Sequence, residues 1–198
     1  MDRRKTRSAL LNAGRARNSA GKIRTGIALG SNLGDRMANL RAARKAIVDL
    51  VRQQTDSPGR ANVKPPVLSS PIYETEPVEC EPDAGKFLNA VLEIEYDGDP
   101  SELLEQLVRV EESLGRKRDH ARNVSRRIDI DLLYADDLSV ENERLQLPHP
   151  RLHQRKFVLQ PLADIRPDLT LPNQTKTVRE LLAQIGDSTK VICFAEKW

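Results

Sequence analysis

The sequence predicts an α+β fold in which helices pack on one face of a mainly antiparallel sheet. Residues 87–96 alternate in the way a strand does, whereas residues 35–54 and 99–114 carry apolar side chains at helical spacing. Along the chain the elements read strand, helix, strand, strand, helix, strand, with additions after them. That is the split βαβ order of a ferredoxin-like sandwich.

The first half of the chain supplies one helix and the strands around it. Residues 23–29 form a short apolar strand, and GSNLGD at 30–35 forms a turn in which Gly30 and Gly34 relax the backbone. A helix then runs from Asp35 to about Gln54. Residues 55–66 contain three prolines and are expected to be a loop. We expect a single strand over 67–73 and an acidic surface loop over 74–85.

The second half supplies further strands and two more helices. In the strand at 87–96, one face is apolar, and the other carries Asn89, Glu93 and Glu95. Asp99 caps a helix that ends near Leu114. A basic segment at 115–127 follows, then a strand at 128–134, one more strand within 156–165, and a last helix at 178–185. We find no internal repeat and expect no second core.

Length and composition indicate one domain with a basic extension. Of 198 residues, 38% are hydrophobic and 31% charged, and no apolar run approaches the ~20 residues of a membrane span. Residues 1–24 hold eight basic side chains against Asp2, so the rest of the chain is net negative although the whole carries +3. We expect residues 1–22 to be a disordered extension and residues 23–198 a single domain. A transit-like segment or an RNA-attracted arm remains an alternative for the extension.

Cysteine usage bears on the compartment. Cys80 and Cys193 match no metal spacing and suggest no disulfide framework, which favours a cytoplasmic protein.

The strongest chemical signal is the strand RRIDIDLLY at 126–134. Alternation places Asp129 and Asp131 on one face and three apolar residues on the other. Two carboxylates on an otherwise apolar strand are costly to bury unless a cation neutralises them, and Mg²⁺ binds through one or two carboxylates plus phosphate oxygens. A pair of solvent-facing strand carboxylates is the alternative.

Basic residues crowd the segment before this strand: Arg116, Lys117, Arg118, His120, Arg122, Arg126 and Arg127. Such density suits a polyphosphate, whose charge needs both metal and guanidinium partners. RNA backbone and a solvated loop are alternatives, but the segment lacks the interleaved aromatic residues that single-stranded nucleic acid favours. Phosphate on a small molecule fits best.

Other residues are weaker candidates. His149 lies between two prolines near Arg155, where it is either structural or a phosphate donor; no metal partner lies at suitable spacing. Phe87 and Phe157 flank polar segments, and they are either core residues or a clamp for a flat heterocycle whose edge Asn89 reads.

Four segments together resemble the 6-hydroxymethyl-7,8-dihydropterin pyrophosphokinase family. They are IALGSNLGD at 27–35, FLNAV at 87–91, RRIDIDLL at 126–133, and LPHPR at 147–151 continuing to RKFVLQPL at 155–162. The resemblance spans about residues 23 to 185. It implies the ferredoxin-like fold and transfer of the β,γ-diphosphate of ATP to the hydroxymethyl group of the pterin, a step of tetrahydrofolate synthesis.

The resemblance also implies roles for individual residues. Two Mg²⁺ ions would be held by Asp129 and Asp131, which with Arg116 and Arg126 form the catalytic set. Contacts to ATP are implied for Glu111, Arg118, Arg122, Arg144, His149 and Arg155. Contacts to the pterin are implied for Phe87, Phe157 and Asn89, with backbone groups of Thr75 and Val78.

The chain departs from the family in the loop before the strand that carries Asp129 and Asp131, and also at Val108, where the family often has a polar residue. The family usually carries Trp-Gly-Pro between two arginines, whereas residues 122–126 read RNVSR. Both arginines remain, but the tryptophan that helps to close the site is missing, so slower or looser catalysis is expected. A relative that binds pterin or nucleotide without turnover and an RNA-binding ferredoxin-like module are the rival interpretations. We expect ATP and the pterin as partners, no membrane, nucleic acid at most weakly through the tail, and a monomer.

Overall fold

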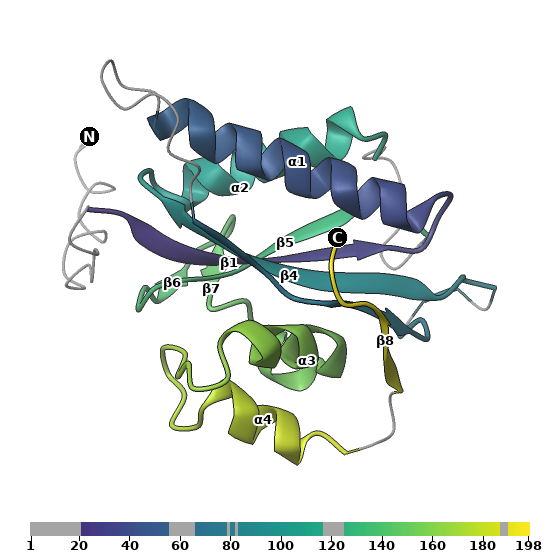
Figure 1. Ribbon diagram of the computed structural model, residues 1–198. Coiled ribbons are helices and arrows are strands. Elements are labelled where there is room, and N and C mark those ends of the chain that lie inside the picture. Colours follow the sequence, from purple (N-terminus) through teal and green to yellow (C-terminus); the bar gives the residue numbers. More distant parts are fainter. Residues whose placement is uncertain (1–20, 56–65, 79, 82, 117–124, 187–189) are drawn as a thin grey trace, which may run out of the picture.

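A six-stranded antiparallel sheet runs through the molecule with helices on both faces (Figure 1). The computed structural model describes residues 21–55, 66–78, 80–81, 83–116, 125–186 and 190–198. The strand order is β5-β1-β4-β3-β8, and β2 pairs with β4. The strands are β1 (Ile23–Ser31), β2 (Val67–Ser69), β3 (Ile72–Thr75), β4 (Phe87–Tyr96), β5 (Asp129–Ala135) and β8 (Val191–Ala195). The predicted α+β sandwich is confirmed.

The helices form two layers instead of the one predicted. On one face lie α1 (Arg36–Thr55) and α2 (Pro100–Ser113); on the other lie α3 (Lys156–Ile165) and α4 (Val178–Gln184) (Figure 1). Between β5 and α3 the chain forms a hairpin of β6 (Val140–Glu141) and β7 (Gln146–Leu147), then the short 3-10 helix η1 (Leu152–Gln154). Among the described helices, none has the length and apolar character needed to cross a bilayer.

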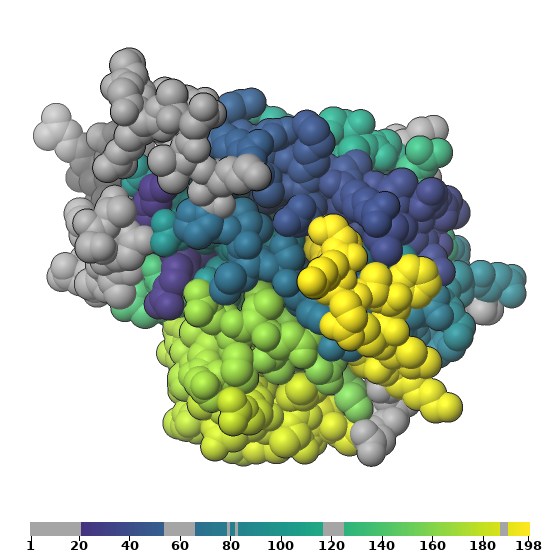
Figure 2. Space-filling view, viewed as in Figure 1, coloured from purple at the N-terminus to yellow at the C-terminus, as the bar shows by residue number. Residues whose placement is uncertain are grey.

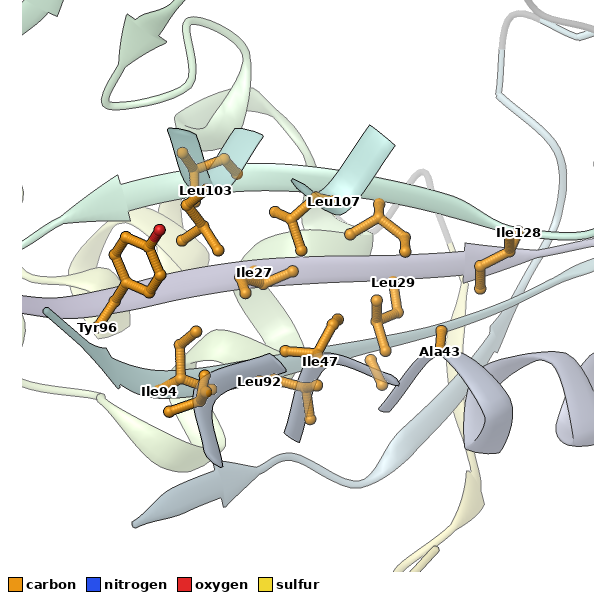
Figure 3. Packing of buried hydrophobic residues seen from close by; sticks show 14 of the residues in the cluster. Ile27, Leu29, Ala43, Ile47, Leu92, Ile94, Tyr96, Leu103, Leu107 and Ile128 are labelled. Atoms are coloured by element: carbon orange, nitrogen blue, oxygen red, sulfur yellow. The ribbon is translucent and has the colours of Figure 1, made fainter. Parts of the chain in front are cut away.

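The first core lies between the sheet and the α1–α2 layer. Ile27 and Leu29 from β1 meet Ile47 of α1 and Leu107 of α2, all fully buried (Figure 3). The predicted cap holds α2 in place, since the Asp99 side chain accepts the N–H of Ser101 at 2.8 Å. Ile128, Ile130 and Leu132 also face this core, so the aspartates between them face the other way.

The other face of the sheet packs on a second hydrophobic core, although the sequence analysis predicted only one core. Val91 and Leu133 meet Leu159 and Leu162 of α3 there. Glu93, which the alternation of β4 placed on a polar face, is buried on this side. It accepts hydrogen bonds from the Tyr134 hydroxyl at 2.6 Å and the Arg166 Nε at 3.0 Å, which satisfies its charge.

The strand predicted within residues 156–165 is wrong, because this segment is helix α3. Val158, Leu159 and Leu162 are buried at helical spacing, and Pro161 lies inside the helix. A short apolar run does not by itself distinguish a buried strand from a buried helix, and an internal proline argues against both.

The single strand predicted at 67–73 is two strands, β2 and β3, separated at Ser70 and Pro71. The Ser70 N–H donates to the Val91 carbonyl at 3.0 Å, and the Ser70 hydroxyl accepts the Val91 N–H at 2.9 Å. Both strands still pair with β4, so the break is an irregularity along one edge of that strand.

The C-terminal segment adds an edge strand that the sequence analysis missed. β8 pairs with β3, and the last residues lie on the surface between the two helical layers (Figure 2). Trp198 ends the chain with its indole N–H donating to the Ser70 carbonyl at 2.8 Å. Residues 191–195 read VICFA, so no alternation of apolar and polar residues marks this strand, and Ile192 and Phe194 are exposed.

Three predicted segments fall largely outside the described residues: the extension 1–22, the loop 55–66 and the basic segment 115–127. β1 begins at Ile23, the predicted start of the domain. The last helix is confirmed, and Thr177 and Glu180 form a capping box at its start.

Candidate active site

A cavity of about 210 Å³ opens between the central strands and the start of α3. Most of the predicted site residues that the structure describes line it. These are Thr75, Val78, Phe87, Asn89, Arg116, Arg126, Asp129, Asp131, His149, Arg155 and Phe157. Residues from three separate parts of the chain are thus gathered in one hollow.

Strand register explains the floor of the cavity. Gly30 of β1 lies directly opposite Asn89 on β4 and opposite Asp129 on β5. Ala28 lies opposite Asp131. Small residues on the central strand therefore separate an amide on one side from two carboxylates on the other, and all of them face the α3 layer.

Gly30 has a different role from the one predicted. It lies within β1, and a Cβ there would come within 3.3 Å of Asn89 Oδ1, 3.8 Å of Phe87 Cδ1 and 3.9 Å of the Asp129 Cβ. Because Gly30 has no side chain, space remains open where these three side chains meet. Gly34 does fit the predicted turn, because its φ of +69° is a conformation that favours glycine.

One end of the cavity is suited to a flat, polar-edged ring. Phe87 and Phe157 both line it. Asn89 is only 6% exposed, and its Nδ2 donates to the Thr75 hydroxyl at 2.8 Å. That bond fixes which way the Asn89 amide faces, so its oxygen lies on the Gly30 side. The Thr75 side chain therefore holds the Asn89 amide in place.

The other end concentrates guanidinium groups around the two aspartates. Asp129 Oδ1 accepts from Arg116 Nη1 at 3.0 Å and from Arg126 Nη1 at 2.8 Å. Asp131 Oδ2 lies 3.5 Å from Arg155 Nη1. The Asp129 and Asp131 side chains are 28% and 38% exposed, so both remain open to the cavity.

The aspartates fit a divalent cation. Burial raises the pKa of the Asp131 carboxyl, and the neighbouring Asp129 charge raises it further. A carboxylate destabilised in this way gains from a cation. Among the described residues no group of three or more His, Cys, Asp or Glu could hold a metal ion. Two carboxylates match the way Mg²⁺ binds, since it keeps its other positions for water and phosphate.

Glu111 lies behind the cavity, where it supports the arginine end. It is 5% exposed, accepts a hydrogen bond from Arg116, and accepts the backbone N–H of Ile130 at 2.7 Å. Burial raises its pKa to about 7, although the Arg116 charge opposes the shift. Glu111 thus ties α2 to the strand between the two aspartates.

His149 is held as a neutral imidazole. Burial, together with the nearby Arg155 and Arg151 charges, lowers its pKa to about 4. Its Nδ1 accepts the Arg151 N–H at 3.2 Å. The proton is therefore on Nε2, which makes His149 a hydrogen-bond donor without a charge.

The remaining predicted residues are more dispersed. Arg144 lies in a neighbouring hollow that shares Asp131 and His149 with the main cavity. Arg118 and Arg122 lie outside the described residues. The Arg155 guanidinium carbon lies 5.5 Å from the centre of the Phe157 ring, so this pair links the two ends of the site.

Three lining residues with polar or ionisable side chains were not predicted as site residues. Glu76 and Cys80 come from the loop before β4, and Arg151 follows His149. Arg151 belongs to the LPHPR segment and could have been found there. No sequence signal marks Glu76 or Cys80, because a loop's path is set by its tertiary contacts.

Comparison with known proteins identifies a family. Residues 26–167 match the model described as 7,8-dihydro-6-hydroxymethylpterin-pyrophosphokinase (HPPK). The 2-amino-4-hydroxy-6-hydroxymethyldihydropteridine pyrophosphokinase of Haemophilus influenzae is 37% identical over 161 residues, covering 81% of this chain and 92% of that protein. The Bacillus subtilis protein of the same name is 45% identical over 139 residues, covering 70% and 75%.

Solved structures share the fold. Wild-type Plasmodium falciparum HPPK-DHPS superposes with a TM-score of 0.57 at 14% identity, covering 82% of this chain and 44% of that chain. The same protein with pterin and p-hydroxybenzoate gives a TM-score of 0.54 at 14% identity, covering 82% and 43%. This chain spans less than half of those longer chains, and at such identity the likeness concerns the fold alone.

Proposed function

This chain belongs to the 7,8-dihydro-6-hydroxymethylpterin-pyrophosphokinase family, and we infer that it transfers a diphosphate from ATP to 6-hydroxymethyl-7,8-dihydropterin. It is an ATP-dependent diphosphotransferase of folate biosynthesis. The products are AMP and the pterin diphosphate.

One observation carries the assignment to this cavity: Asn89, Gly30 and Asp129 lie in a row across three neighbouring strands. With strands about 4.8 Å apart, the Asn89 and Asp129 backbones are about 10 Å apart. A small substrate held by Asn89 at its ring edge therefore extends over Gly30 towards the aspartates. Phosphoryl transfer depends mainly on such positioning.

We assign the pterin to the end formed by Phe87, Asn89 and Phe157. The two rings would stack on the heterocycle, and the Asn89 amide oxygen would accept from its edge. Thr75 orients that amide, and the backbone of Val78, which lines the cavity, would complete the contact. The hydroxymethyl group then faces Asp129.

We assign the ATP phosphates to the arginine end. Arg116 and Arg126 now pair with Asp129, and each can exchange that carboxylate for phosphate oxygens when the nucleotide binds. His149 would donate from Nε2 and Arg155 would neutralise charge. Arg144, in the adjoining hollow, would contact the rest of the nucleotide, as would Arg118 and Arg122; Glu111 supports Arg116 from behind.

Asp129 and Asp131 would hold Mg²⁺, with two ions expected. When bound, Mg²⁺ would neutralise phosphate charge and polarise the attacking hydroxyl. In the transfer, the hydroxymethyl oxygen bonds to the β-phosphorus of ATP and its proton is released. The bond from that phosphorus to the α,β-bridging oxygen breaks, and AMP leaves with the electron pair.

We also propose a cytoplasmic, monomeric enzyme whose catalytic domain is residues 23–198. The free thiols of Cys80 and Cys193 support a reducing compartment. The family match lies inside this single sheet-and-helix unit. Removing residues 1–20, which precede β1, should leave kcat unchanged; a large loss would show that the extension takes part.

The first test is nucleotide product analysis with ATP, Mg²⁺ and 6-hydroxymethyl-7,8-dihydropterin. AMP that forms only when the pterin is present supports diphosphate transfer. ADP would mean that a single phosphoryl group moves and would overturn the proposal. Pterin binding without any nucleotide product would identify a binding protein instead.

A further inference from the structure

Asn32, just after β1, joins the two ends of the candidate site through its hydrogen bonds. It is 7% exposed. Its backbone N–H donates to the Arg126 carbonyl at 3.2 Å, and its Oδ1 accepts the Arg126 N–H at 2.7 Å. Its Nδ2 donates to the Ser125 hydroxyl at 3.1 Å and to the Gly85 carbonyl at 3.4 Å. The Arg126 backbone is thus held on both its donor and its acceptor side.

A second contact to this backbone, at Ser125, comes from Glu81 in the loop at the pterin end. The Ser125 N–H donates to Glu81 Oε1 at 3.0 Å. Hydrogen bonding from the Ser125 side chain and backbone lowers the pKa of Glu81, so the acceptor is charged at neutral pH. A charged acceptor makes this bond stronger than a neutral one.

Glu81 belongs to the loop at residues 76–86, from which Glu76, Val78 and Cys80 line the cavity. Ser125 immediately precedes Arg126, whose guanidinium contacts Asp129 at 2.8 Å. The Glu81–Ser125 contact therefore connects the wall of the pterin end to the backbone of a phosphate-end arginine. A proline at position 125 would have no N–H to donate.

We propose that Glu81 and Ser125 are positioning residues that couple occupancy of the pterin end to the placement of Arg126. This rests on the proposed function. When a ring fills the cavity against the 76–86 loop, the loop is restrained, and the Glu81–Ser125 contact restrains Arg126 with it. Each ligand then strengthens binding of the other, by linkage.

The test uses variants that remove the contact from either side. Glu81→Ala removes the acceptor, Glu81→Gln keeps an uncharged acceptor, and Ser125→Pro removes the donor. Asp83→Ala is the matched control, because Asp83 is an exposed acid of the same loop. Calorimetry measures 6-hydroxymethyl-7,8-dihydropterin binding with and without a non-hydrolysable ATP analogue and Mg²⁺.

In the wild type the analogue should tighten pterin binding. We expect Glu81→Ala to reduce that enhancement by about fivefold, Glu81→Gln by less, and Asp83→Ala not at all. Ser125→Pro also removes the hydroxyl that accepts from Asn32, so it is expected to be the stronger single change. Glu81→Ala combined with Ser125→Pro should be no worse than Ser125→Pro alone, because the Glu81–Ser125 bond is already lost in the single variant.

Equal enhancement in Glu81→Ala and Asp83→Ala would overturn the coupling, as would additive losses in the double variant. If Ser125→Pro fails to fold, the comparison of Glu81→Ala with Asp83→Ala still decides the question. AMP release is measured in parallel. Pterin-dependent AMP release with no effect of the Glu81 variants would refute only the coupling. Normal ligand binding without AMP release would refute only the proposed function.

Discussion

Asn89 donates a 2.8 Å hydrogen bond to the Thr75 hydroxyl, and both side chains are buried at the floor of the cavity. The contact joins β3 to β4 at the point where the proposed pterin edge is read. This hydrogen bond fixes the orientation of the Asn89 side-chain amide.

Thr75→Val should weaken pterin binding by about tenfold and leave nucleotide binding nearly unchanged. The substitution keeps the shape but leaves the Asn89 amide N–H₂ without its buried acceptor, which costs about 1–3 kcal/mol. Thr75→Ser retains the hydroxyl and is the control. Titration calorimetry with each ligand checks this, and an equal loss for both ligands would contradict the assignment.

Gly30→Ala should also weaken pterin binding, whereas Gly30→Val should abolish it. The added Cβ of alanine lies 3.3 Å from Asn89 Oδ1 and takes up space over the cavity floor. Gly186→Ala is the matched control, since no atom lies within 4 Å of its added Cβ. Unchanged pterin affinity in Gly30→Val would show that the ring binds elsewhere.

Asp129→Asn and Asp131→Asn should each lower AMP formation by about a thousandfold while circular dichroism shows a folded protein. Each change removes one of two carboxylates proposed to hold Mg²⁺, whose electrostatic contribution is several kcal/mol. Asp83→Asn, a change of the same type outside the cavity, should retain activity. Chelation should abolish wild-type activity and added Mg²⁺ should restore it; activity without divalent cation would disprove the metal assignment.

His149 should remain neutral down to about pH 5. Its folded pKa of about 4 lies below the ordinary value of 6.5, so the unfolded chain binds the extra proton between these values. The contribution of His149 to stability is therefore present above about pH 6.5 and is lost as pH falls towards 4. Wild-type Tm should fall across that window more steeply than the Tm of His149→Gln.

The imidazole signal of His149, assigned by its loss in the variant spectrum, gives a direct check by NMR. A midpoint near 6.5 would mean that the ring is solvated. In that case its proposed role as an uncharged donor fails.

Local patterns predicted much of the fold. The alternation in residues 87–96 gave the bounds of β4, and Asp99 marked the start of α2. Strand geometry alone placed Asp129 and Asp131 on one face, which the structure confirms. These features depend on neighbours two to four residues apart, so they are readable from the chain itself.

The tertiary structure decided what depends on residues distant in sequence. Whether residues 156–165 form a strand or a helix was settled by the sheet face they cover, because the buried stripe of α3 meets Val91 and Leu133. Gly30 makes space only because Asn89 and Asp129 are its cross-strand neighbours. Glu111 became part of the site's support through Ile130, nineteen residues away. A sequence records residue types and local periods, whereas contacts between strands and layers exist only after the chain has folded.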